Sequence, residues 1–212
     1  MNKLGSEPIV PMVLRISILS MLAQFVSVLY SIVDRMFVGR IPDVGYLCLG
    51  GIGVCGPIVT MIGSFAFLVG IGGSPIMSIK LGEQNKEDAK HILCQSFGLI
   101  IAISIFLTLC LYPLSKTIIY SFGSSDILYP YAIDYFRIYL SGIIFSLISV
   151  CMNQFIIAQG YAKEGMISVC IGAICNILFD PLFIYGLNLG VRGAAIATVL
   201  SQMLSCLYVL YF

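Results

Sequence analysis

The sequence contains no tryptophan, a single histidine and few charged residues, which make up only 10% of its 212 residues. Soluble domains usually carry about 25% charged residues, so the composition excludes an ordinary water-soluble fold. Hydrophobic residues make up 59% of the chain, and the mean hydropathy is +1.04. The net charge is +1 and the basic residues form no run, so nucleic acid is not an expected partner. We therefore expect an all-α, multi-pass protein of the lipid bilayer.

Motifs for metal, nucleotide and redox chemistry are also missing. His91 has no second ligand at a useful spacing, and the eight cysteines form no C-x-x-C pair, so we expect them to be small buried residues. No Walker A motif occurs, so ATP bound to this chain would not drive transport. Gly51, Gly53 and Gly56 spell G-x-G-x-x-G, but they open an apolar helix and do not follow a strand, which favours close helix contact. We expect no bound cofactor.

Six apolar stretches are long enough to cross a bilayer, which takes roughly 20 residues of helix. Turn-forming sequences such as GRIPDVG and GLNLGVRG separate them, so the sequence predicts a single lobe of six transmembrane helices within residues 1–212. The eleven basic residues divide six against five between the two sides. The basic loop 80–91 favours cytoplasmic termini, in the cell membrane. The predicted spans are 11–38, 51–79, 91–114, 130–159, 165–185 and 192–212.

Polar side chains follow one face of several predicted spans. Polar residues recur at spacings of three and four from Ser17 to Asp34, and again from Tyr135 to Asn153, which places each set on one side of a helix. Such stripes can serve only to hold helices together, but together they also suggest a bundle around a wet or ion-binding cavity. The predicted cavity residues are Gln24 and Ser31 in the first span and Tyr135, Tyr139 and Asn153 in the fourth.

Two aspartates lie within predicted spans, where an ionised carboxylate is costly to bury. Asp34 lies near the end of the first span and Asp180 near the end of the fifth, which runs in the same direction. Thr198 lies near the start of the sixth span, which runs the other way, so these three residues share one depth. Asn153 lies nearer the opposite side. Because helix association needs no ionisable group, the aspartates favour an ion-binding role.

Pro181 directly follows the second aspartate and predicts a hinge, because proline lacks a backbone donor and frees the carbonyl of residue 177. Intramembrane aspartyl proteases also use two aspartates, but theirs include a G-x-G-D element. Here Ile-Leu-Phe precedes Asp180, so we expect no enzyme.

Three other charged residues are given surface roles. Arg35 points about 100° away from its neighbour Asp34 on a helix, so we expect it to reach towards the membrane surface. Asp134 and Arg137 are three residues apart near the end of a span, which predicts a surface ion pair.

Three stretches resemble a known family: YSIVDRMFVGR (30–40), KLGEQNKEDA (80–89) and NILFDPLFIYGLNLGVRGAAIAT (176–198). In this order and spacing they resemble the N-terminal half of a MATE (multidrug and toxic compound extrusion) transporter. The resemblance implies twelve helices in two six-helix lobes and cation-coupled export of small organic cations. The sequence ends at Phe212 after the sixth span. A C-terminal lobe or a second parallel copy would therefore be needed to complete the transporter.

The resemblance also implies a cation site in this lobe. The acidic residues of the first and fifth helices fall on Asp34 and Asp180, the N-x-x-x-D asparagine on Asn176 and the sixth-helix threonine on Thr198. Oxygen ligands suit a hard cation such as Na⁺, and two neighbouring carboxylates can equally hold a proton, since burial and like charge favour the neutral acid. Some members bend the first helix at a proline, but none occurs in 12–41, so this bend is not expected.

Two alternatives stay open at this point. A flippase for lipid-linked saccharides from the same superfamily would be expected to have a more cationic cavity than Arg15 and Arg35 provide. A truncated half-lobe that does not transport is the second. The sequence leaves both the choice between Na⁺ and H⁺ and the substrate undecided.

Overall fold

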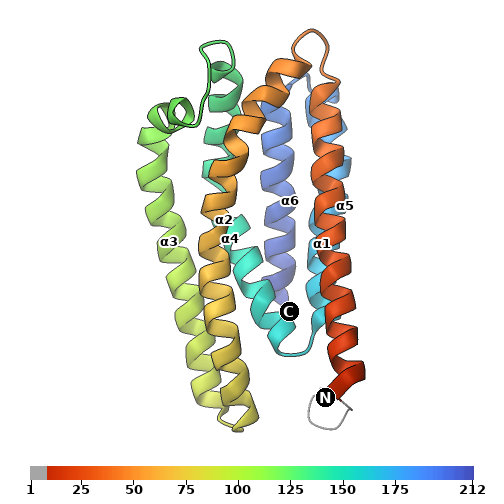
Figure 1. Cartoon of the computed structure of the whole chain (residues 1–212), viewed down its shortest axis with the longest axis vertical. Coiled ribbons are helices and arrows are strands. Elements are labelled where there is room, and N and C mark those ends of the chain that lie inside the picture. Colours follow the sequence, from red (N-terminus) through yellow and green to blue (C-terminus); the bar gives the residue numbers. More distant parts are fainter. Residues whose placement is uncertain (1–8) are drawn as a thin grey trace.

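The structure is a computed structural model that describes residues 9–212. Six long helices run up and down beside one another, and no strand occurs among these residues (Figure 1). Each helix is long and apolar enough to cross a membrane, which confirms the predicted all-α transmembrane lobe. The largest boundary difference is at the third span, predicted to end at 114. The helices are α1 (Ile9–Gly39), α2 (Gly45–Gly82), α3 (Lys86–Ser121), α4 (Tyr129–Ala158), α5 (Ala162–Pro181) and α6 (Val191–Tyr211).

Every connection between helices contains a residue with positive φ. This conformation ends an α-helix because it turns the backbone out of the right-handed spiral. The α2–α3 turn is also capped, since the Asn85 side chain accepts a hydrogen bond from the backbone N–H of Asp88 at 3.2 Å. The positive-φ residues are Asp43, Gln84, Gly123, Gly160, Asn188 and Gly190. These turns were readable in the sequence as short polar and glycine-containing breaks.

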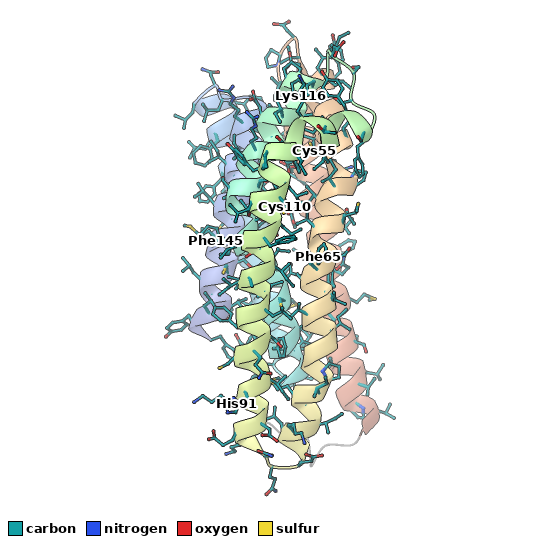
Figure 2. The ribbon with its side chains drawn as sticks, turned by 90° about the vertical axis from the view of Figure 1, so that its left-hand side faces the viewer. Cys55, Phe65, His91, Cys110, Lys116 and Phe145 are labelled. Atoms are coloured by element: carbon teal, nitrogen blue, oxygen red, sulfur yellow. The ribbon has the colours of Figure 1, made fainter. Side chains whose placement is uncertain are left out.

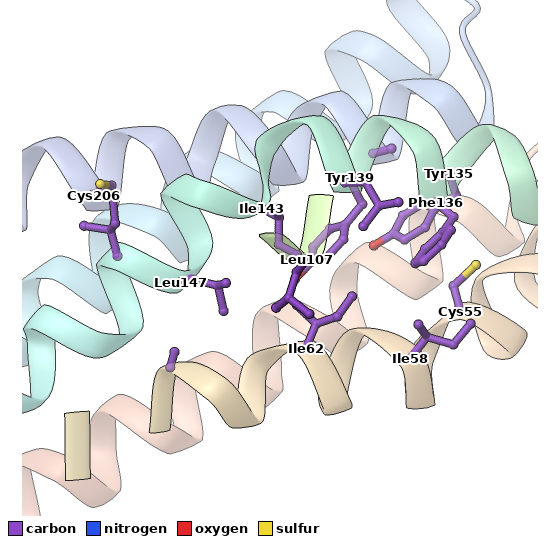
Figure 3. Packing of buried hydrophobic residues seen from close by; sticks show 14 of the residues in the cluster. Cys55, Ile58, Ile62, Leu107, Tyr135, Phe136, Tyr139, Ile143, Leu147 and Cys206 are labelled. Atoms are coloured by element: carbon purple, nitrogen blue, oxygen red, sulfur yellow. The ribbon is translucent and has the colours of Figure 1, made fainter. Parts of the chain in front are cut away.

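The core of the lobe lies along α4, which packs mainly against α2 and α6. Phe136 and Phe155 of α4 are almost fully buried. Figure 3 shows Tyr135, Phe136 and Tyr139 of α4 in one cluster with Ile58 and Ile62 of α2. By contrast, the outside of the bundle carries many exposed apolar side chains, as a lipid-facing surface does. Figure 2 shows His91 near one end of α3 and Lys116 near the other, with Phe65 between those levels.

The predicted ion pair between Asp134 and Arg137 is wrong. Arg192, at the start of α6, donates from Nε and Nη2 to the two oxygens of Asp134 at 2.9 and 3.1 Å. Arg137 instead lies over the Tyr112 ring, with 5.6 Å between its guanidinium carbon and the ring centroid. The reason is tertiary, because the start of α6 lies beside the start of α4. The side chains of Arg192 and Asp134 are 60% and 35% exposed, so the pair contributes about 0–1 kcal/mol.

The glycines of the G-x-G-x-x-G sequence have different roles. A Cβ at Gly51 would lie 2.9 Å from the backbone nitrogen of Ala132 in α4, whereas Gly53 and Gly56 have no other group within 4 Å of that position. Close helix contact therefore explains only Gly51. All eight cysteines are free, and four of them are buried, so the prediction that they are buried holds for half of the set.

Candidate functional site

The two intramembrane aspartates meet between α1 and α5. These helices lie side by side and run in the same direction (Figure 1), so Asp34 and Asp180 reach the same depth. Asp34 is 9% exposed and Asp180 is fully buried, and the two carboxyl groups are electrostatic neighbours. Two neighbouring ionised carboxylates repel each other unless a cation or a proton is shared between them. The arrangement therefore suits a positive ligand.

Asn176 and Thr198 complete this cluster. Asn176 lies one turn before Asp180 and is 1% exposed. Its Nδ2 donates to Asp180 Oδ1 and to Thr198 Oγ1, both at 3.5 Å. Thr198 Oγ1 in turn donates to the Ala194 carbonyl at 2.9 Å. All four residues proposed for the ion site therefore lie together, although they come from three helices. We refer to Asp34, Asn176, Asp180 and Thr198 as the aspartate site.

Three oxygens of the aspartate site are buried and have no hydrogen-bond partner among the described residues. They are Asp34 Oδ1, Asn176 Oδ1 and Asp180 Oδ2. An unpaired buried acceptor costs about 1–3 kcal/mol, so three in one place favour a ligand that supplies positive charge. Among residues 9–212, no group of three His, Cys, Asp or Glu side chains is placed to hold a metal ion. Two carboxylates with neutral oxygens fit a monovalent cation better than a transition metal.

A cavity of about 210 Å³ opens beside Asp34. Residues of α1, α2, α4 and α6 line it, whereas the fully buried Asp180 is not part of the lining. The rings of Tyr135 and Tyr139 stack with 6.4 Å between their centroids and form part of the wall. Three predicted cavity residues therefore line this space: Ser31, Tyr135 and Tyr139.

The other two predicted cavity residues lie elsewhere. Asn153 Oδ1 accepts a weak hydrogen bond from Ser168 Oγ at 3.4 Å, near the start of α5. This agrees with its expected depth on the opposite side. Gln24 is exposed on α1, ten residues before Asp34 along the chain. Neither side chain is brought to the aspartate site.

The cavity also contains residues that the sequence did not single out for it. Arg35 is exposed, as predicted for a side chain that reaches the surface, yet it also lines the cavity beside Asp34. Thr60 and Gln202 line the cavity as well. Gln202 carried a usable signal, since it lies one turn after Thr198, but Thr60 stands in an apolar helix with no polar stripe.

The helix changes type immediately after the second aspartate. Pro181 is the last residue of α5, and a π-helical turn, η1 (Leu182–Gly186), follows it. Leu187 N–H bonds to the Leu182 carbonyl at 2.9 Å, which is the i→i+5 pattern of such turns. π-turns are rare and frequently occur at functional sites. The hinge at Pro181 thus coincides with a change in backbone geometry, and its movement stays a prediction.

A hydrogen bond from Tyr185 connects η1 to α1. Its hydroxyl donates to the Phe37 carbonyl at 2.6 Å, one turn after Asp34. Tyr185→Phe is expected to lower the free energy of unfolding by about 1 kcal/mol, the usual contribution of one hydrogen bond. Thermal unfolding of the purified protein in lipid nanodiscs measures this loss. Tyr46→Phe, at a tyrosine that is 72% exposed, is the control, and an equal loss in both variants would contradict the role assigned to Tyr185.

Comparisons with known proteins identify the family and relatives of this chain. The MatE family model matches residues 20–182. The multidrug export protein MepA of Staphylococcus aureus (strain NCTC 8325 / PS 47) is 25% identical over 97% of this chain and 46% of its own length. MepA of Staphylococcus haemolyticus (strain JCSC1435) is 26% identical over 91% of this chain and 42% of its own length. The chain thus spans less than half the length of these relatives.

Solved structures also match nearly all of this chain and less than half of their own length. Crystal structures of MATE in the bent and straight conformations match with TM-scores of 0.87 and 0.86, each at 28% identity over 94% of this chain and 44% of theirs. A transporter of the MOP superfamily from Pyrococcus furiosus Vc1 matches with a TM-score of 0.85 at the same identity and coverage. Here α1 is one uninterrupted helix from Ile9 to Gly39.

Proposed function

Because the chain belongs to the MatE family of transporters, we propose that it is the cation-binding lobe of an antiporter that exports organic cations in exchange for Na⁺ or H⁺. The observation that carries the proposal is the aspartate site, with its two neighbouring carboxyl groups and three unpaired buried oxygens. The relatives named as multidrug export proteins support an outward direction of transport. The lobe would lie in the cell membrane with both termini in the cytoplasm.

The exchange follows from competition for negative charge. With Na⁺ or a proton at the aspartate site, the charge of Asp34 and Asp180 is partly neutralised and the cavity binds an organic cation weakly. When the coupling ion leaves, the cavity becomes more negative. The rings of Tyr135 and Tyr139, which line the cavity, add cation–π attraction for a desolvated organic cation. A returning ion then displaces the substrate, because each ligand favours the conformation that it binds better.

A complete transport path needs more surface than this lobe provides. The chain covers only 46% of the length of the S. aureus relative. We propose that a C-terminal lobe or a second copy supplies the rest of the transport path. An even number of spans puts both termini on one side, so two copies would insert in parallel.

The flippase alternative is less well supported. An anionic, phosphate-linked saccharide would need a cavity with excess positive charge. Arg35 is the only basic residue that lines the cavity, and Asp34 lies beside it. The lining therefore carries no excess positive charge for an anionic substrate.

Transport by the full-length protein in proteoliposomes tests this function. One arm applies a Na⁺ gradient at fixed pH and the other a pH gradient without Na⁺, each with a fluorescent organic cation as substrate. We expect one gradient to drive accumulation and the substrate to accelerate movement of the same ion in the opposite direction. If neither gradient moves the substrate, the proposed function is wrong.

A further inference from the structure

Gln202 connects the cavity beside Asp34 with a second one. It lies on α6, one helical turn after Thr198, and both residues line both cavities together with Tyr30. The second cavity has a volume of about 120 Å³, and serines from α1, α4 and α6 make up much of its wall. We call it the serine cavity. The shared residues make the two spaces neighbours along α6.

The serine hydroxyls present oxygen lone pairs, because their hydrogens are used elsewhere. Ser205 Oγ donates to the Ser168 carbonyl at 2.9 Å, and Ser201 Oγ donates to the Thr198 carbonyl at 2.8 Å. Ser149 Oγ lies 2.9 Å from Ser205 Oγ. Since the single hydrogen of Ser205 is already committed, Ser149 is the donor of that pair. The serine cavity is therefore rich in acceptors, which suits a cation.

Gln202 places an unpaired acceptor between the cavity beside Asp34 and the serine cavity. Its Oε1 is buried and has no hydrogen-bond partner among the described residues. An amide oxygen is a normal ligand of a hard cation, and a buried one without a partner gains most from such a ligand. Neither helix contact nor the four-residue aspartate site accounts for this oxygen.

We propose that Gln202 is a further ligand of the coupling cation and passes it between the aspartate site and the serine cavity. The inference rests on the proposed function, since it concerns the same ion. In this role Oε1 holds the cation after it leaves Asp34 and before the serine oxygens receive it. Gln202 thus controls the rate of cation exchange more than the affinity at equilibrium.

The test compares equilibrium binding with exchange in the full-length protein, using radioactive Na⁺ at fixed pH and, in a second arm, a pH-sensitive dye without Na⁺. Gln202→Leu removes the oxygen at similar volume. We expect exchange of the coupling ion to slow about tenfold, while its dissociation constant changes by less than about threefold. Gln202→Glu keeps an oxygen at the same reach and is expected to retain most of the rate.

Gln95→Leu makes the same chemical change at an exposed position on α3 and is expected to leave both measurements unchanged. Exchange at the wild-type rate in Gln202→Leu overturns the inference while the proposed function stands. Equal losses of binding and exchange overturn it too, because Gln202 would then belong to the static site. Absence of ion exchange in the wild type overturns the proposed function and the inference together.

Discussion

Asp180→Asn is expected to reduce cation-driven export by at least about 100-fold. Removing one partner from a buried charged interaction typically costs about 3–5 kcal/mol, and each 1.4 kcal/mol is a factor of ten in affinity. Asp180 is fully buried, so solvent does not compensate for the lost charge. Asparagine has nearly the same shape, and the neighbouring helices stay in place. Uptake of a fluorescent organic cation into proteoliposomes measures the loss.

The stability of the same variant separates a functional role from a structural one. Asp180 lies against a second carboxyl and leaves Oδ2 unpaired, so without a bound cation the aspartate stabilises the fold poorly. Asp180→Asn is therefore expected to unfold at the same temperature as the wild type or at a higher one. Asp126→Asn, at an exposed carboxylate that accepts from the Tyr120 hydroxyl at 2.9 Å, is the matched control and should transport normally. Full export by Asp180→Asn would refute the assignment of the site.

Gly193→Val is expected to lower the free energy of unfolding by about 1–3 kcal/mol, the usual cost of overfilling a close contact. A Cβ at Gly193 would lie 2.6 Å from the Phe183 carbonyl oxygen and 2.9 Å from the Ile184 nitrogen. Both are backbone atoms of η1, so neither can rotate away. The start of α6 or the π-turn has to move, and with it the Tyr185 link to α1.

Thermal unfolding in nanodiscs, with and without the coupling ion, measures this effect. A bound ion stabilises the native state according to its affinity, so the stabilisation by the ion should also shrink in Gly193→Val. Gly98→Val is the control, because a Cβ at Gly98 on α3 meets no other group within 4 Å. Equal destabilisation of both variants would show that helix propensity, and not the contact with η1, is responsible.

Much of the lobe could be predicted from the sequence, because the bilayer imposes simple rules. Long apolar runs predict the transmembrane helices. Because successive spans run in opposite directions, the position of a residue along its span predicts its depth in the membrane. Depth correctly grouped Asp34, Asp180 and Thr198 and correctly set Asn153 apart. These inferences needed only the direction of each span and the position of a residue along it.

The sequence did not predict features that depend on the rotation of each helix about its axis and on how the helices pack against one another. Asp134 pairs with Arg192, 58 residues away, where local spacing pointed to Arg137. The π-turn after Pro181 is stabilised by contacts with α1, such as the Tyr185 hydrogen bond, that no local pattern encodes. Gln24 follows the polar stripe of α1 but is exposed, because periodicity gives relative angles and not the direction of the partner.

The contact between α1 and α5 also determines when the site can form. Besides a small contact with α2, α1 packs almost entirely against α5, and most of its apolar side chains stay exposed. During synthesis the N-terminal helices enter the membrane first. Most of the packing surface of α1 therefore faces lipid until α5 has been made. The two aspartates are 146 positions apart in sequence (34 and 180) and meet only then. Assembly of the lobe therefore ends, and does not begin, with the part that binds the ion.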